Sequence, residues 1–332
     1  MKLQDYQQYL SHAYSLHTQE ANEASSDQIL RGSLMPHAHG KTEVPIIDGI
    51  PRFVSADNYA ANFGLQWNAF RSTQLDSRTG LPLSNDRFWK NTHWSPTDLI
   101  GRTVLEIGSG AGRFTEVLLA AGARVVSMDY SSAIDANLAN NGNRGDVFFL
   151  QGDLYDLPLE DARFDFVFCY GVLQHTRDPA LAYRRIFAKV KPGGRISIDW
   201  YRRFPLPNAW STPKYFWRPF VKDIAPEKLL SIVRSYMPYW FPIDNAIRRI
   251  PKLGPALLAF IPIPCWNYLG SGLSYEQRKE WAVLDTFDAL GATYDQPLTL
   301  DEVRDLVQSD ENASTSVFYG SNGIVANIRK IG

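Results

Sequence analysis

The chain has 332 residues, of which 45% are hydrophobic and 21% charged, an ordinary composition for a protein that buries a core. Its 34 basic and 35 acidic residues give a formal net charge of −1, so no overall basic field favours nucleic acid or anionic lipid as a partner. Its two cysteines are too few for a disulfide framework. These observations predict a cytoplasmic protein of one large domain with additions, or of two modest domains.

Residues 1–100 show weak hydrophobic periodicity, several aromatic residues and turn signals. The first twenty residues lack the apolar core of a signal peptide. We interpret residues 1–100 as an N-terminal leader that acts as a lid segment.

From Gly101 to Tyr201, short apolar or β-branched runs alternate with helical runs. The predicted strands are 103–108, 124–130, 147–153, 164–171 and 195–201, and the predicted helices are 111–122, 132–141 and 179–190, with a turn at "KPGG". This alternation is typical of a doubly wound α/β fold with a parallel sheet. The fully apolar strands indicate that both faces of the sheet are covered.

Residues 202–296 interrupt this rhythm and are rich in proline and aromatic residues. We interpret them as an inserted helical cap that binds substrate. Within it, the apolar stretch 254–270 is broken by prolines and is too short to span a bilayer. It is expected to be buried or to line a pocket, with weak membrane contact as a minor alternative, and no stable membrane insertion is expected.

Residues 297–332 are expected to complete the core. A helix is predicted over 299–309, with Thr299 as N-cap and Glu302 three residues on. Two alternating runs, 315–320 and 323–330, are predicted to close a seven-stranded, mostly parallel, Rossmann-like sheet.

The stretch "EIGSGAG" follows a buried strand and opens a helix. Glu106 precedes Gly108, Gly110 and Gly112, a spacing that differs from the dinucleotide pattern G-x-G-x-x-G. Backbone N–H groups at a helix start favour an anion, and a carboxylate suits them as well as a phosphate.

Two further acids follow at the ends of the next two strands. Asp129 is placed to accept hydrogen bonds from both ribose hydroxyls, and Asp153 to accept from an adenine amine with the backbone of Leu154 beside it. Ribose, adenine and a carboxylate without phosphate describe S-adenosylmethionine better than NAD.

Residues 101–201 resemble class I S-adenosylmethionine-dependent methyltransferases, because five motifs follow in order: "VLEIGSGAGRF", "VVSMDYS", "GDLYDLP", "FDFVFCYGVLQHTRDP" and "KPGGRISI". The resemblance implies S-adenosylmethionine as cofactor. It assigns Glu106 and the three glycines to the methionine and ribose end. Tyr130 and Ser131 would flank the adenine, and Tyr170 and Gly171 would lie beside the sulfonium.

The flanks, residues 49–77 and 280–299, resemble a bacterial methyltransferase subgroup associated with polysaccharide and secondary-metabolite gene clusters. Members often begin with a small zinc ribbon of paired C-P-x-C motifs. Here the matching stretch "LMPHAHG" keeps His37 and His39 but has no cysteine. Two histidines do not make a closed tetrahedral site, so we interpret a degenerate zinc ribbon and expect no metal.

Two catalytic candidates follow core strands. His175, with an ordinary pKa near 6.5, suits proton transfer from a hydroxyl, but it serves equally well as a histidine that packs under the helix start. Asp199 is a second base candidate, and a loop-anchoring role is slightly favoured for it.

The substrate candidates come from three segments. Gln66 and Trp67 are expected to form a lid or a seam between leader and core. Asp285 and Asp288, beside aromatic residues, are expected either to bind sugar hydroxyls or an amine, or to cap the insertion. Tyr201 and Arg202 open an aromatic and basic stretch that suits sugar rings, aromatic metabolites or prenylated substrates, or packs within the cap.

The sequence therefore predicts a methyltransferase that acts on an oxygen or nitrogen of a small molecule, with a sugar or glycosylated metabolite as the favoured acceptor. The alternatives are an aromatic or lipid-like natural product as acceptor, a non-catalytic S-adenosylmethionine-binding regulator, and an NAD oxidoreductase, which the glycine spacing disfavours.

Overall fold

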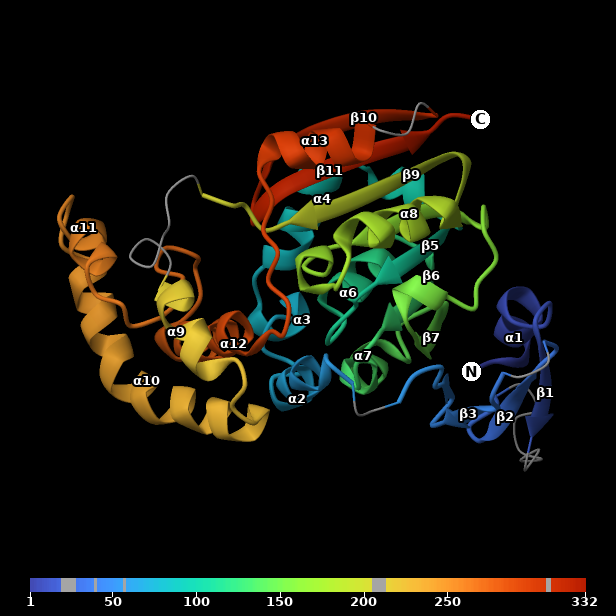
Figure 1. Ribbon diagram of the computed structural model, residues 1–332, viewed down its shortest axis with the longest axis horizontal. Helices are drawn as coiled ribbons and strands as arrows, with labels where there is room; N and C mark the ends of the chain where they lie inside the picture. The colour runs from blue at the N-terminus through green and yellow to red at the C-terminus, as the bar shows by residue number, and fades with distance from the viewer. Residues whose placement is uncertain (19–27, 39–40, 56–57, 205–212, 309–311) are drawn as a thin grey trace.

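The computed structural model describes residues 1–18, 28–38, 41–55, 58–204, 213–308 and 312–332. Within these ranges, a seven-stranded sheet with the order β10-β11-β9-β8-β5-β6-β7 forms the centre of the molecule (Figure 1). Its strands are β5 (Thr103–Ile107), β6 (Arg124–Asp129), β7 (Val147–Gln151), β8 (Phe164–Cys169), β9 (Val190–Trp200), β10 (Ala313–Gly320) and β11 (Gly323–Lys330). β11 runs antiparallel to β9 and β10, and the other neighbours pair in parallel. The predicted mostly parallel, seven-stranded sheet is confirmed.

Helices cover both faces of this sheet. The helices are α6 (Arg113–Ala120), α7 (Ala133–Asn141), α8 (Pro179–Lys189) and α13 (Leu300–Gln308), joined by α4 (Leu83–Thr92) from the leader. Successive residues of β5 enter different cores, because side chains alternate along a strand. Val104 packs in the cluster with α4 and α6, and Leu105 packs in the cluster with α8 and α13. Burial on both faces explains why the strands read as continuous apolar runs.

Two predicted boundaries can be compared with the structure. The capping box of α13 is confirmed: the backbone N–H of Thr299 donates to Glu302 at 2.8 Å, and that of Glu302 donates to the Thr299 hydroxyl at 3.3 Å. The predicted "KPGG" turn before β9 is wrong, since β9 begins at Val190. A register shift opposite Phe164 and Phe166 absorbs the extra residues, so pairing with β8 continues past the glycines.

The leader contains regular structure that its weak periodicity did not indicate. After α1 (Leu3–Tyr9), the short strands β1 (Tyr14–Thr18), β2 (Gly32–Pro36), β3 (Val44–Ile47) and β4 (Ile50–Pro51) form a small antiparallel sheet. It adjoins β7 at one edge of the main sheet, where the N–H of Phe53 donates to Gln151 O at 2.8 Å. In Figure 1 it lies on the opposite side of the molecule from α10 and α11.

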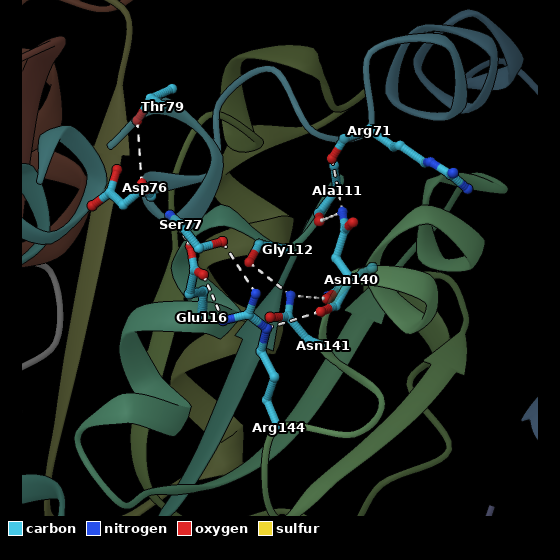
Figure 2. A network of polar contacts seen from close by, with 11 residues as sticks. Arg71, Asp76, Ser77, Thr79, Ala111, Gly112, Glu116, Asn140, Asn141 and Arg144 are labelled. Carbon is cyan, nitrogen blue, oxygen red and sulfur yellow. Dashed lines mark hydrogen bonds and ion pairs between the residues drawn. The ribbon is translucent and has the colours of Figure 1, made fainter. Parts of the chain in front are cut away.

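The second half of the leader is fixed to the core by polar contacts (Figure 2). It includes the short helices α2 (Ala61–Ala69), α3 (Asp76–Thr79) and α5 (Pro96–Leu99). The Asn140 amide donates to Arg71 O at 2.7 Å and to Ala111 O at 2.8 Å. Arg144 pairs with Glu116 at 2.7 Å and donates to the Ser77 hydroxyl at 3.1 Å. These bonds tie residues 71–77 to the glycine-rich loop.

The predicted helical insertion before the last strand pair is confirmed. It consists of α9 (Pro213–Val221), α10 (Pro226–Arg248), α11 (Gly254–Ala259) and α12 (Tyr275–Gly291). α10 and α12 share a third apolar core with Phe70 of the leader. The prediction that 254–270 is buried or lines a pocket is wrong for Leu257 and Phe260, which are 47% and 76% exposed, whereas Trp266 lines a cavity. Within the described residues, no helix has both the length and the apolarity needed to cross a membrane.

Candidate active site

A cavity of about 550 Å³ opens at the carboxyl ends of the parallel strands. Gly108 to Gly110 follow β5, Tyr170 and Gly171 follow β8, and Tyr201 follows β9. The leader contributes Phe63, Gln66, Trp67, Arg71, Gln74 and Arg87, and the cap contributes Lys214, Tyr215, Trp266, Tyr268, Asp285 and Asp288. Three segments far apart in the sequence therefore enclose one space. Its size is typical of a small-molecule site.

The glycine-rich loop needs glycine for two reasons. Gly110 has φ 54°, and a Cβ there would lie 3.1 Å from the Trp67 ring. Gly112 has φ 87°, and a Cβ there would lie 2.0 Å from the Asn137 side-chain oxygen. Left-handed backbone and close packing together exclude a side chain. The backbone of the loop is thus exposed to the cavity under the ring of Trp67.

Two buried polar side chains in the cavity wall lack partners. Gln66 is 0% exposed, and neither its amide nitrogen nor its amide oxygen has a hydrogen-bond partner among the described residues. The hydroxyl of Ser109 is in the same condition. Buried polar groups are nearly always paired in native proteins, so these two side chains indicate a polar ligand.

The predicted cofactor residues divide into two groups. Gly108, Gly110, Tyr170 and Gly171 line the cavity, whereas Glu106, Gly112, Asp129, Tyr130, Ser131, Asp153 and Leu154 are not part of its lining. The second group borders or supports the loop instead.

Asp129 and Asp153 are bonded to their own loops. Asp129 accepts from Gly110 N at 2.9 Å and from the N–H and hydroxyl of Ser131 at 2.8 and 2.7 Å. Asp153 accepts from Tyr155 N at 2.9 Å. The ring of Tyr130 stacks on Tyr59 of the leader with centroids 4.9 Å apart.

Glu106 lies behind the loop rather than in the cavity. One of its oxygens accepts from Thr115 at 2.5 Å and from Ser127 at 3.0 Å, and the other has no partner among the described residues. Burial raises the pKa of this carboxyl to about 7. Its contacts join β5, α6 and β6 beneath the glycines.

Neither catalytic candidate lines the cavity. Asp199 accepts from Gly171 N at 2.5 Å and from Arg87 at 2.7 Å. His175 packs between Phe63 and Tyr201, with ring centroids at 5.2 and 5.3 Å. Its Nδ1 lies 2.8 Å from the carbonyl oxygen of Tyr294. Since a carbonyl only accepts, Nδ1 carries the hydrogen in the neutral ring and Nε2 keeps a lone pair.

All six residues predicted to bind substrate line the cavity: Gln66, Trp67, Tyr201, Arg202, Asp285 and Asp288. Their roles stay predictions.

Of these six residues, Asp285 lies in a hydrogen-bond network that reaches the residue after the glycine-rich loop. It accepts from the Tyr268 hydroxyl and, at 3.3 Å, from Gln74, which in turn accepts from Arg113 at 2.5 Å. Burial is the main cause that raises the pKa of Asp285 to about 7. Asp288 accepts from Tyr201 at 3.5 Å.

Known proteins are similar to the core of this chain. The methyltransferase domain family matches residues 105–198. A demethylmenaquinone methyltransferase of Clavibacter sepedonicus is 28% identical over 178 residues, which are 53% of this chain and 70% of that relative. A ubiquinone biosynthesis O-methyltransferase of Azotobacter vinelandii is 33% identical over 110 residues, 32% of this chain and 47% of the relative. The matching core, residues 105–198, is therefore a class I S-adenosylmethionine-dependent methyltransferase domain.

Among solved structures, the 1,6-didemethyltoxoflavin-N1-methyltransferase of Burkholderia thailandensis is similar to this chain. The two are 16% identical with a TM-score of 0.42, and the match covers 96% of this chain and 100% of the other. Because the curated relatives are matched over 47% to 70% of their length, the acceptor of this methyltransferase is treated below as a proposal.

The residues of the cavity fit S-adenosylmethionine. The unpaired Gln66 amide and Ser109 hydroxyl, beside a loop that admits no side chain at Gly110, suit the amino-acid end of that molecule. That its ribose and adenine bind beside Asp129, Tyr130 and Asp153 stays a prediction, because these residues lie at the ends of β6 and β7 but are not part of the cavity lining. The group carries no phosphate, in agreement with a loop that lacks the dinucleotide spacing.

Sequence reasoning missed several lining residues of the methyltransferase. Arg87 lines the cavity and pairs with Asp199, and no motif of the sequence indicates it. Arg113 and Tyr268 were not singled out. A signal existed for Arg113, because it directly follows the last glycine of the loop. No local pattern marks Tyr268, whose partner Asp285 lies on another element.

The zinc-ribbon stretch gives no support for a metal. His37 Nε2 lies 3.1 Å from the Ser15 hydroxyl, and His39 lies outside the described residues. In the part of the methyltransferase that the structure describes, no three side chains of His, Cys, Asp or Glu gather as metal ligands do. The expectation of no metal stays a prediction.

Proposed function

We propose that this methyltransferase transfers a methyl group to a hydroxyl oxygen of a ring-bearing small molecule, with Asp285 as the base. One observation carries the proposal: a single cavity joins the glycine-rich loop to the Asp285–Tyr268 pair. The cofactor site and a proton acceptor thus open into one space.

Asp285 has the properties of a base for a hydroxyl acceptor. A carboxyl whose pKa is raised to about 7 is partly ionised at neutral pH and is a stronger base than an ordinary carboxylate. The Tyr268 hydroxyl donates to it and steadies the charged form. Gln74 bonds both Asp285 and Arg113, which connects the base to the residue after the glycine-rich loop.

S-adenosylmethionine supplies an electrophilic methyl on a positively charged sulfur. The cavity aligns the acceptor oxygen with that methyl and excludes water. A carbon–oxygen bond forms as the carbon–sulfur bond breaks, and the acceptor proton passes to Asp285. Tyr170 and Gly171, which line the cavity after β8, lie where an aromatic face and backbone oxygens stabilise positive charge.

An aromatic hydroxyl is the acceptor that we favour. Phe63, Trp67, Tyr215 and Trp266 provide flat walls, which suit a planar ring. A phenol also loses its proton to a base of pKa about 7 more easily than a sugar hydroxyl does. The names of two relatives, which refer to menaquinone and ubiquinone, agree with this class.

A sugar remains the second candidate, and one observation favours it. Asp285 and Asp288 present two carboxyl groups to the same cavity, an arrangement that accepts hydrogen bonds from neighbouring hydroxyls.

His175 and Asp199 have positioning roles in this proposal. Asp199 holds Arg87 and the backbone of Gly171, and His175 supports Phe63 and Tyr201. Histidine as the base stays a prediction that a His175→Gln variant tests.

The direct experiment offers the purified protein S-adenosylmethionine with a panel of hydroquinones, phenols, nucleotide sugars and amines, and measures S-adenosylhomocysteine. Turnover with hydroquinones or phenols is expected. Turnover with sugars alone would move the acceptor to the second candidate, and turnover with amines alone would contradict hydroxyl methylation. Tight cofactor binding with no turnover on any panel member or on a cell extract would favour a non-catalytic regulator.

A further inference from the structure

The helix α10 has two apolar faces, of which only one is covered. Leu229, Val233 and Phe241 are fully buried against α12. On the opposite side, Ile232 is 41%, Tyr239 79% and Ile243 50% exposed. An ordinary surface helix carries polar residues there. The outward face of α10 is therefore unusually apolar.

The exposed apolar surface continues onto α11 and α9. Leu253 is 63%, Leu257 47%, Phe260 76% and Phe220 72% exposed. We call the set the outer apolar face: Phe220, Ile232, Tyr239, Ile243, Ile250, Leu253, Leu257, Phe260 and Ile263. In Figure 1, α10 and α11 lie along the edge of the molecule opposite the small sheet. Contiguous exposed apolar residues of this kind mark an interaction surface.

The charge beside the α10–α11 part of this surface is mostly positive. Between Lys228 and Ser274 the sequence contains a single acid, Asp244. That residue is 2% exposed and pairs with Arg248 at 2.7 Å. The other charged residues of this stretch are bases: Lys228, Arg234, Arg248, Arg249 and Lys252. Of these, Arg248 is the one that pairs with Asp244. Two exposed acids, Asp223 and Glu227, lie just before this stretch, so the positive charge is concentrated toward Arg249 and Lys252, beside the exposed residues of α11.

We propose that the outer apolar face docks on the surface of a membrane that contains anionic lipid. Apolar and aromatic side chains would enter the headgroup boundary, and the flanking bases would meet lipid phosphates. A second copy of the chain fits less well, because the five bases of the α10–α11 stretch outnumber the exposed acids next to it, Asp223 and Glu227. The inference concerns a surface that the methyl-transfer proposal does not use.

The surface is continuous with the wall of the cavity. The Trp217 indole of α9 donates to Pro262 O after α11, so the two elements are joined. Tyr215 and Trp266, from the same two segments, line the cavity. If the acceptor is lipid-like, which is one of the alternatives that the sequence leaves open, the docked orientation places the entrance of the cavity beside the membrane. The docking itself does not depend on that acceptor.

Co-sedimentation of the full chain with vesicles tests the proposal. Binding to phosphatidylglycerol-containing vesicles is expected, with weaker binding to pure phosphatidylcholine and a decrease as salt is raised. Leu253→Glu and Phe260→Glu are each expected to reduce binding about tenfold. Ile100→Glu is the matched control, since Ile100 is 65% and Leu253 63% exposed, and it is expected to bind as the wild type does.

S-adenosylhomocysteine affinity, measured by calorimetry, shows that each variant is folded. No sedimentation of the wild type with anionic vesicles would overturn the proposal. So would equal losses in Leu253→Glu and Ile100→Glu. A vesicle-free dimer in analytical ultracentrifugation that the Leu253→Glu change abolishes would assign the face to self-association instead.

Discussion

The core and the cap border the same cavity through different kinds of contact. In the core, Asp129 is held by backbone and hydroxyl groups of its own neighbourhood, Gly110 and Ser131. In the cap, Asp285 is held by side chains, those of Tyr268 in the cap and Gln74 in the leader. The cofactor half of the site thus rests largely on backbone N–H groups of the core loops, whereas the acceptor half depends on side chains that the leader and the cap bring together. The two halves should respond differently to substitution.

The largest expected effect is on turnover. Asp285→Asn keeps the shape of the side chain and removes the proton acceptor, so turnover should fall by about 10²–10⁴. The measurement is S-adenosylhomocysteine formation with the best acceptor of the panel. Asp288→Asn, in the same cavity, is the control and should lose much less. Equal losses in both variants would contradict Asp285 as the base.

Gly110→Ala should disrupt the cofactor half. At φ 54°, its new Cβ would lie 3.1 Å from Trp67, so cofactor affinity should fall at least about tenfold as the loop shifts. Gly101→Ala is a matched control, with φ 67° and no atom within 4 Å of the added Cβ. It should cost about 1–2 kcal/mol of stability but leave calorimetric affinity unchanged. Loss of affinity in the control would mean that strain alone explains the result.

Tyr268→Phe should change the pH dependence of catalysis. The pKa of Asp285 is raised to about 7 by burial and lowered in part by the Tyr268 hydrogen bond. The wild-type rate should therefore rise with pH through about 7, as the base ionises. The variant should show the same limb at higher pH, with turnover near neutral pH reduced about tenfold. If the limb stays at the same pH in the variant, Tyr268 does not influence the pKa of the base.

The remaining expected effect concerns stability rather than activity or binding. The Glu106 carboxyl has a pKa of about 7 in the folded chain against an ordinary value of 4.5. Between these values the folded state keeps a proton that the unfolded state loses, so the free energy of unfolding should fall as pH rises through this window and level off above it. The free energy of unfolding can be measured with urea at pH 5 and at pH 8. Between these pH values it should fall less in Glu106→Gln than in the wild type, by up to about 3 kcal/mol. An equal fall would place the titration elsewhere.

The sequence predicts the core well because its signals are local. The three glycines and the acids Glu106, Asp129 and Asp153 stand at fixed positions within short motifs at the ends of β5, β6 and β7. Thr299 and Glu302 form the predicted capping box for the same reason. The strands β1 to β4 escaped prediction because they have two to five residues each, too few for a clear alternation.

The cap shows the opposite limit. Asp285 and Asp288 were correctly expected near one another, since they share a helix, but Tyr268 and Arg87 join them only through tertiary packing. The stretch 254–270 illustrates the same point. Its apolar composition predicts burial, yet Phe260 is 76% exposed, because the face of α10–α11 that contacts α12 is already filled.

Calorimetry with S-adenosylhomocysteine on Asp129→Ala and Asp285→Asn tests most directly whether one cavity is divided between a cofactor half and an acceptor half. Asp129→Ala should weaken binding at least about tenfold, since it removes the bond to the Gly110 backbone and the predicted ribose contact. Asp285→Asn should leave the affinity within about twofold of wild type. Unchanged binding in Asp129→Ala, or a comparable loss in Asp285→Asn, would contradict the division.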